Sequence, residues 1–243
     1  MIKVLLKILL LIASAVYLVF AMTTLSKSQK EVVCNDIAYD IRFRDGQRTK
    51  QIVDIPFVTS LLKRNHIAPK GKSLGEINLT GIRQILEKNV YIDSAFCYYT
   101  AAGTLCVDVI PKKAVMKVIT PTKEFYLTDG GSAMPVGEYQ VAVPTVTGEI
   151  SVARARRLRP LLEYIENSKW RKKTEGISLD AKEGLVLKMK DEPYDVAIGS
   201  EENYEEKLRK LDLFTEKVFS KTGKERYRRI NVAFEGQVVG VKR

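Results

Sequence analysis

The 243-residue chain has few of the residues that build metal and redox sites. It contains three cysteines, Cys34, Cys97 and Cys106, and a single histidine, His66. An odd cysteine count does not form a disulfide framework, no CxxC spacing occurs, and one imidazole leaves few ligands for zinc. We therefore expect neither a metal ion nor a cofactor.

Arrangements of catalytic residues are equally scarce. Gly71-Lys72-Ser73 resembles the end of a phosphate-binding loop, but His66 stands where that motif requires its first glycine. His66 itself lies at an expected helix end, where a favourable contact with the helix dipole is a more common role than catalysis. Asp129 lies in a glycine-rich turn with no second carboxylate nearby in the sequence. We therefore expect no enzyme activity and no small-molecule substrate.

The charge is strongly positive, with a formal net charge of +11 and a pI of about 9.4. Such a balance indicates an anionic surface or partner, or simply solvated faces. The basic residues gather at Arg154, Arg156, Arg157 and Arg159, at Lys169, Arg171, Lys172 and Lys173, and at Arg226, Arg228 and Arg229. Solvated surface is the favoured interpretation of each cluster, with anionic lipid or an acidic protein as the alternative.

The first segment is apolar. No charged residue occurs in the 19 residues from Ile8 to Ser26, which as a helix would span roughly 28 Å, close to the hydrocarbon core of a bilayer. Residues 1–26 are therefore expected to be a short cytoplasmic tail and a transmembrane helix, followed by a linker at 27–32. The alternative is a signal peptide cleaved after Val19-Phe20-Ala21. An uncleaved anchor implies a single-pass membrane protein with its amino terminus in the cytoplasm and its bulk outside, away from nucleic acid.

Residues 33–113 show the order β-α-α-β-β. Apolar residues alternate from Val33 to Phe43, helical spacing follows from Pro56 to Asn65, and Asn78 is suited to cap a second helix. Two strands then carry Cys97 and Cys106. Strand alternation places these two thiols on opposite faces, so we expect both to be free. The alternative is a Cys97–Cys106 disulfide, which a slip in the register of the hairpin would permit.

Residues 114–243 predict a second, mixed β domain with two helices, at Ser151–Lys169 and Asn203–Ser220. The last predicted strands, Arg229–Phe234 and Gln237–Lys242, flank a two-residue turn at Glu235-Gly236. Thr128 to Gly137 is interpreted as a loop. The expected fold class is therefore α+β.

These features together resemble the FtsQ/DivIB family of bacterial cell-division proteins, and in particular its members from the Bacteroidetes group. The β-α-α-β-β unit is similar to the POTRA domain of that family. The strings that carry the resemblance are LCVDV with Pro111, FYLTDGGSAMPVG from Phe125, VPTVTG from Val143, and INV from Ile230 with the following QVV. One departure is Ile110, which replaces a basic residue commonly found before the proline of the family.

The resemblance implies a divisome scaffold that supports septal cell-wall synthesis. Its expected partners are the small coiled-coil proteins FtsB and FtsL. The POTRA domain and the anchor would help to recruit the protein to midcell, with FtsK as a further partner. The implied location is the bacterial inner membrane, with the bulk of the chain in the periplasm. We expect these partners to add a strand to the final hairpin. The predicted contact residues are Phe234, Gly236, Gln237, Val238, Val239, Gly240, Val241 and Lys242. The alternative function is a POTRA-containing module for envelope assembly or secretion.

Overall fold

The computed structural model describes residues 10–22, 32–42, 53–137 and 141–243. Residues 10–22 form a helix whose apolar side chains are exposed. Within the described ranges, no helix combines the length and the apolar character needed to cross a membrane. Both ends of the predicted 19-residue span lie outside the described residues, as does most of the predicted linker at 27–32.

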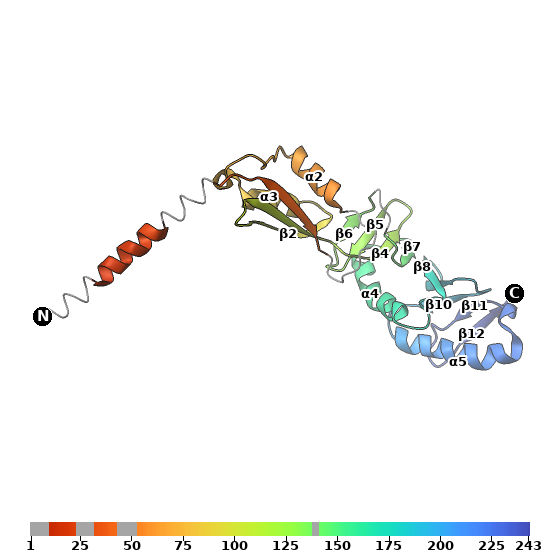
Figure 1. The fold of residues 1–243 in the computed structure, drawn as a ribbon. Coiled ribbons are helices and arrows are strands. Elements are labelled where there is room, and N and C mark those ends of the chain that lie inside the picture. Colours follow the sequence, from red (N-terminus) through yellow and green to blue (C-terminus); the bar gives the residue numbers. More distant parts are fainter. Residues whose placement is uncertain (1–9, 23–31, 43–52, 138–140) are drawn as a thin grey trace. The chain divides into compact units, whose positions relative to one another are not determined.

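The described chain forms two compact units, the first ending at Pro111 and the second running from Lys112 to Arg243. The first unit has the predicted order β-α-α-β-β, with two helices packed on one small sheet (Figure 1). Its elements are β1 (Asp36–Ile41), α2 (Ile55–Arg64), α3 (Leu79–Glu87), β2 (Ile92–Tyr99) and β3 (Thr104–Pro111), with a 3₁₀ turn at Leu74–Glu76. The strand order is β1-β3-β2, in which β1 runs parallel and β2 antiparallel to β3.

Each helix of the first unit begins at a polar side chain that caps its first turn. The side chain of Asp54 accepts a hydrogen bond from the backbone N–H of Phe57 at the start of α2. Asn78 accepts one in the same way from the N–H of Gly81, which confirms it as the predicted cap of α3. Each cap satisfies a backbone donor that the first helical turn leaves without a partner.

The two cysteines of the hairpin lie as the alternation predicted. Cys97 is the register partner of Val107, and Cys106 that of Tyr98, so the two thiols point to opposite faces of the sheet. Cys97 packs against the core of the first unit, beside the buried Ala95 and Val107. All three cysteines are free thiols.

The second unit is built on one sheet of nine strands in the order β12-β11-β10-β9-β8-β7-β4-β5-β6 (Figure 1). The strands are β4 (Ala114–Ile119), β5 (Glu124–Thr128), β6 (Ala133–Pro135), β7 (Thr145–Thr147), β8 (Thr174–Asp180), β9 (Gly184–Met189), β10 (Asp195–Gly199), β11 (Tyr227–Asn231) and β12 (Val239–Lys242). The helices are α4 (Val152–Glu166) and α5 (Tyr204–Thr222), with a 3₁₀ turn at Lys224–Arg226.

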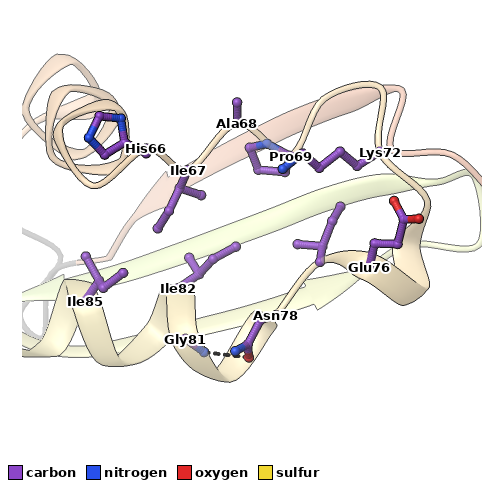
Figure 2. Close-up of a pocket in the computed structure, with 11 residues that line it drawn as sticks. His66, Ile67, Ala68, Pro69, Lys72, Glu76, Asn78, Gly81, Ile82 and Ile85 are labelled. Atoms are coloured by element: carbon purple, nitrogen blue, oxygen red, sulfur yellow. Dashed lines mark hydrogen bonds between the residues drawn. The ribbon is translucent and has the colours of Figure 1, made fainter.

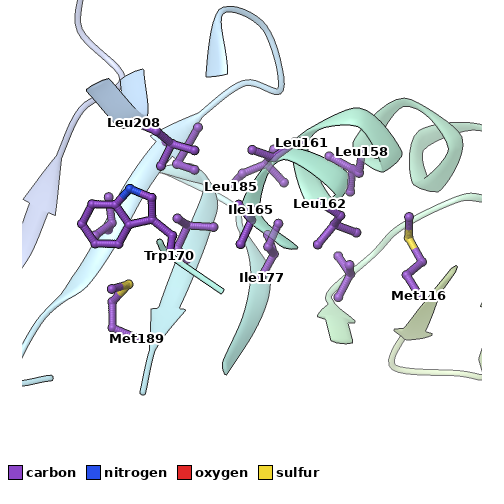
Figure 3. Packing of buried hydrophobic residues seen from close by; sticks show 14 of the residues in the cluster. Met116, Leu158, Leu161, Leu162, Ile165, Trp170, Ile177, Leu185, Met189 and Leu208 are labelled. Carbon is purple, nitrogen blue, oxygen red and sulfur yellow. The ribbon is translucent and has the colours of Figure 1, made fainter. Parts of the chain in front are cut away.

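The helices of this unit bury their apolar stripes against the sheet. Figure 3 shows Leu158, Leu161 and Ile165 of α4 packed in one core with strand residues such as Ile177 and Leu185. Trp170 closes the core after α4, and Leu208 and Leu211 of α5 complete it. The stripe explains why α4 continues through Pro160, because the packing of its buried face offsets the backbone hydrogen bond that the proline removes.

Three local predictions need correction. The predicted loop Thr128 to Gly137 contains the short strand β6, and β7 was not predicted. The final strands are joined by the seven residues 232–238 rather than by a two-residue turn. β11 ends early because the side chain of Asn231 accepts the N–H of Ala233, an Asx turn that diverts the chain.

Candidate partner-binding site

The last strand, β12, lies at one end of the nine-stranded sheet. It pairs antiparallel with β11, with Tyr227 opposite Lys242, Ile230 opposite Gly240 and Asn231 opposite Val239. No other strand of the described chain pairs with β12. Its outer side therefore presents backbone groups that a further strand can bind.

The opposite end of the sheet is poorly suited to strand addition. There β6 contains only Ala133–Pro135, and Pro135 has no N–H to donate. Met134 is buried within this strand. A short edge that ends in proline is a common protection against unwanted pairing, whereas β12 has no proline. The β12 edge of the sheet is thus better suited to strand addition than the β6 edge.

The direction of the free backbone groups on β12 follows from one hydrogen bond. The N–H of Arg243 donates to the carbonyl of Arg226, 3.0 Å away, so at this residue the backbone points toward the β11 side. Along a strand this direction alternates. The register shift lies on the β11 side, between Tyr227 and Arg229, so β12 stays regular. Gly240 and Lys242 therefore point their N–H and carbonyl groups away from β11.

An exposed aromatic ring lies in the loop that leads into the edge. The Phe234 side chain is 54% exposed, and the Val239 side chain at the start of β12 is 41% exposed. The Phe234 carbonyl accepts a hydrogen bond from Nζ of Lys210 on α5, which ties the loop to that helix. Leu213, one turn further along α5, is 42% exposed. Apolar side chains are thus available beside the free backbone.

A cluster of aromatic rings supports the edge from the helix side. The Tyr227 ring lies 5.7 Å from the ring of Phe214 and 5.8 Å from that of Phe219, measured between centroids. The Phe219 ring lies 5.1 Å from that of Tyr194, whose pKa is raised by burial, so it stays a neutral phenol. These contacts hold Tyr227 in place against Gly240.

The predicted site residues divide between the edge strand and its loop. Val239, Gly240, Val241 and Lys242 form β12 itself. Phe234, Gly236 and Gln237 are exposed in the loop, with Gly236 at a φ of +63° at its tip. Val238 packs partly against the core and is the residue least available to a partner. The structure therefore brings the predicted residues together along one edge.

The arginines of α4 have partners within their own unit. Nε of Arg156 donates to the carbonyl of Gly131, and Nη1 of Arg159 donates to the carbonyl of Asp129, each over 2.5 Å. Nε of Arg157 lies 3.0 Å from a carboxylate oxygen of Glu201. This basic cluster thus holds the turn between β5 and β6 and the segment after β10.

A shallow pocket in the first unit offers little chemistry. It has a volume of about 240 Å³ and is lined mainly by aliphatic side chains such as Ile67, Ile82 and Ile85. Figure 2 shows His66 and Glu76 at opposite ends of this pocket, so they do not form an acid–base pair. No group of three or more potential metal-ligating side chains occurs among the residues described.

The sequence did not indicate the contribution of Lys210 and Leu213, or the support that Tyr227 gives to Gly240. The helical spacing of α5 predicted a buried stripe, but not which of its exposed residues would meet a loop 24 positions away. The sequence around Gly240 did not indicate its contact with Tyr227 either, because that ring belongs to the neighbouring strand, where Tyr227 is paired with Lys242.

Two family models match this chain. The model described as FtsQ/DivIB, C-terminal related, matches residues 113–241, and the model described as a POTRA-like domain matches residues 32–110. Together they cover both compact units and meet close to the boundary between them. A search of curated proteins finds no match.

Proposed function

Because the chain belongs to the FtsQ/DivIB family, we propose that it is a membrane-anchored scaffold of the division machinery that binds FtsB-like and FtsL-like proteins at β12. The observation that carries this proposal is the free outer side of β12, beside the exposed Phe234 and Val239. In strand addition the backbone supplies affinity, and exposed side chains at the edge supply specificity. The protein acts in this proposal without catalysis, by holding its partners at the site of septal cell-wall synthesis.

The location in the inner membrane belongs to the same proposal. It rests on the uncharged run from Ile8 to Ser26, which is long enough for a bilayer, with the folded units in the periplasm. The POTRA-like unit is proposed to assist recruitment, with FtsK as a further partner. Intact mass of the purified protein tests the anchor, because a mature chain that starts near Met22 would show that the segment is cleaved.

The decisive binding experiment compares two substitutions at Lys242. Lys242→Pro removes a backbone donor that points away from β11, whereas Lys242→Ala removes the side chain and keeps that donor. We expect Lys242→Pro to weaken binding of the FtsB-like protein by tenfold or more, on the order of 1.4 kcal/mol. Lys242→Ala should weaken binding much less than Lys242→Pro, because the backbone donor stays in place. Thermal unfolding of both variants shows whether the domain stays folded, and equal binding by two folded variants would remove this edge from the interface.

The alternative function, an envelope assembly or secretion module, is favoured only by the POTRA-like unit. The two functions predict different phenotypes after depletion of the protein. A scaffold for division predicts long filamentous cells, whereas an assembly module predicts loss of outer-membrane proteins at normal cell length.

A further inference from the structure

The two ends of β12 differ in charge. Near its first residue lie the exposed apolar side chains of Val239 and Phe234. At its last residue, Lys242 is paired in register with Tyr227, and Tyr227 is flanked in sequence by Arg226 and Arg228. Arg226, Arg228 and Lys242 are therefore all within one residue of the Tyr227–Lys242 pair.

These three cations are not neutralised by the described part of the unit. Arg226, Arg228 and Lys242 are exposed, and within the described ranges their side chains form no ion pair or hydrogen bond. The nearby carboxylates serve other cations, since Lys224 binds Glu192 at 2.8 Å and Arg229 binds Glu183 at 3.3 Å.

Two further charges complete this end of the sheet. The guanidinium of Arg243 donates to the carbonyl of Pro193, so it remains a full positive charge. Glu225 provides one exposed carboxylate in the same turn. Together with the three cations, the formal charge at this end of β12 stays positive.

We propose that the occupant of this edge is a protein strand with two unlike ends, apolar where it meets Val239 and Phe234 and acidic where it meets Arg226, Arg228 and Lys242. This inference rests on the proposed function and adds the chemistry of the partner. A strand added to β12 lies about 4.8 Å from it and about twice that distance from β11. Its side chains therefore meet Lys242 directly, whereas Arg226 and Arg228 attract it from across β12, within about one Debye length. Opposite charges across neighbouring strands stabilise the pairing and set its register.

The test uses the full chain in detergent and two synthetic peptides. The peptides share the same alternating Val and Thr residues and differ only at three positions near one end, which are Glu in one peptide and Lys in the other. At about 50 mM salt we expect the acidic peptide to bind at least about tenfold more tightly, with the preference shrinking at about 500 mM salt because surface charges are then screened.

A charge-reversed protein provides the matched comparison. The triple variant Arg226→Glu, Arg228→Glu and Lys242→Glu should prefer the basic peptide, while its unfolding temperature stays close to that of the original protein because all three side chains are exposed. An unchanged preference in this variant, or binding of neither peptide to the original protein, would overturn the proposal.

The outcomes also separate this inference from the proposed function. Equal binding of both peptides, lost in Lys242→Pro, would leave strand addition at β12 intact and remove the acidic partner. Charge-dependent binding that survives Lys242→Pro would place the occupant elsewhere and overturn both. A dimer that forms without peptide and is lost in Lys242→Pro would identify a second copy as the occupant and also overturn the proposal.

Discussion

Gly240 lies against one edge of the Tyr227 ring: a Cβ atom built on this glycine would stand 2.5 Å from Cε1 of the ring and 2.8 Å from Cδ1. The ring cannot readily move away, because it is 7% exposed and contacts Phe214 and Phe219. The edge strand and the core of the second unit are therefore coupled at this position.

This contact predicts that Gly240→Ala destabilises the second unit. Adding a methyl group to a packed site typically costs about 1–3 kcal/mol, and we expect a loss of unfolding free energy in that range. Val239→Ala is the control, since the Val239 side chain is 41% exposed and its removal should cost less than about 1 kcal/mol. Urea unfolding of both variants provides the measurement. Equal stability of Gly240→Ala and the original protein would show that Tyr227 does not constrain the edge.

Phe234→Ala and Phe214→Ala should differ in effect, the first on partner binding and the second on stability. Phe234 is 54% exposed in the loop, so Phe234→Ala should leave stability nearly unchanged and weaken binding of the FtsB-like protein by about 2 kcal/mol, if the ring is buried by the partner. Phe214 belongs to the aromatic cluster, so Phe214→Ala should lower the unfolding free energy by roughly 2 kcal/mol or more. Calorimetric titration and thermal unfolding separate the two. Unaltered binding by folded Phe234→Ala would exclude the ring as an anchor.

Local signals in the sequence were sufficient for the first unit. Its helices begin at side chains that cap them, Asp54 and Asn78, and its strands alternate between a buried and an open face. These are properties of short segments, so periodicity and cap residues predict them well. The alternation of the strands likewise predicted that Cys97 and Cys106 lie on opposite faces.

Local patterns in the sequence did not predict two features of the second unit, the end of β11 and the edge position of β12. The alternation of Ile230, Val232 and Phe234 predicted a strand to residue 234, and Val232 does donate its N–H to the carbonyl of Ala197. The Asx turn at Asn231 nevertheless ends the pairing with β12, and one side-chain hydrogen bond is not visible in a hydrophobic pattern. The edge position of β12 depends on pairs between distant segments, such as β4 with β7 and β10 with β11, which no local window contains.

The thiol of Cys97 provides a prediction on pH. Burial, followed by the nearby carboxylate of Asp108, raises the pKa of Cys97 to about 11. Because the thiolate is the reactive form, its fraction below pH 11 increases about tenfold for each pH unit. Iodoacetamide should therefore modify Cys97 in the folded protein about 100-fold faster at pH 9.5 than at pH 7.5. The unfolded protein in urea is the control, and equal rates for the folded and unfolded protein at pH 7.5 would contradict the burial of this thiol.

The ion pair between Arg42 and Asp108 predicts a difference between two variants of the first unit. The guanidinium Nη2 lies 2.7 Å from Oδ2 of Asp108, whose side chain is 6% exposed, and Nε of the same arginine lies 2.8 Å from Asp40. Asp40 is also the register partner of Asp108, so the cation separates two carboxylates on neighbouring strands. A buried acceptor left without its partner, as the Asp108 carboxylate would be, typically costs about 1–3 kcal/mol.

Arg42→Gln should accordingly lower the urea midpoint of the first unit. The matched control is Lys70→Gln, which breaks an ion pair of 3.4 Å with Asp36 in which both side chains are largely exposed, so it should change stability little. The double variant Arg42→Gln with Asp108→Asn should recover part of the loss, because it removes the buried charge together with its partner. Equal midpoints for Arg42→Gln and Lys70→Gln would show that solvent, rather than Arg42, satisfies the Asp108 carboxylate.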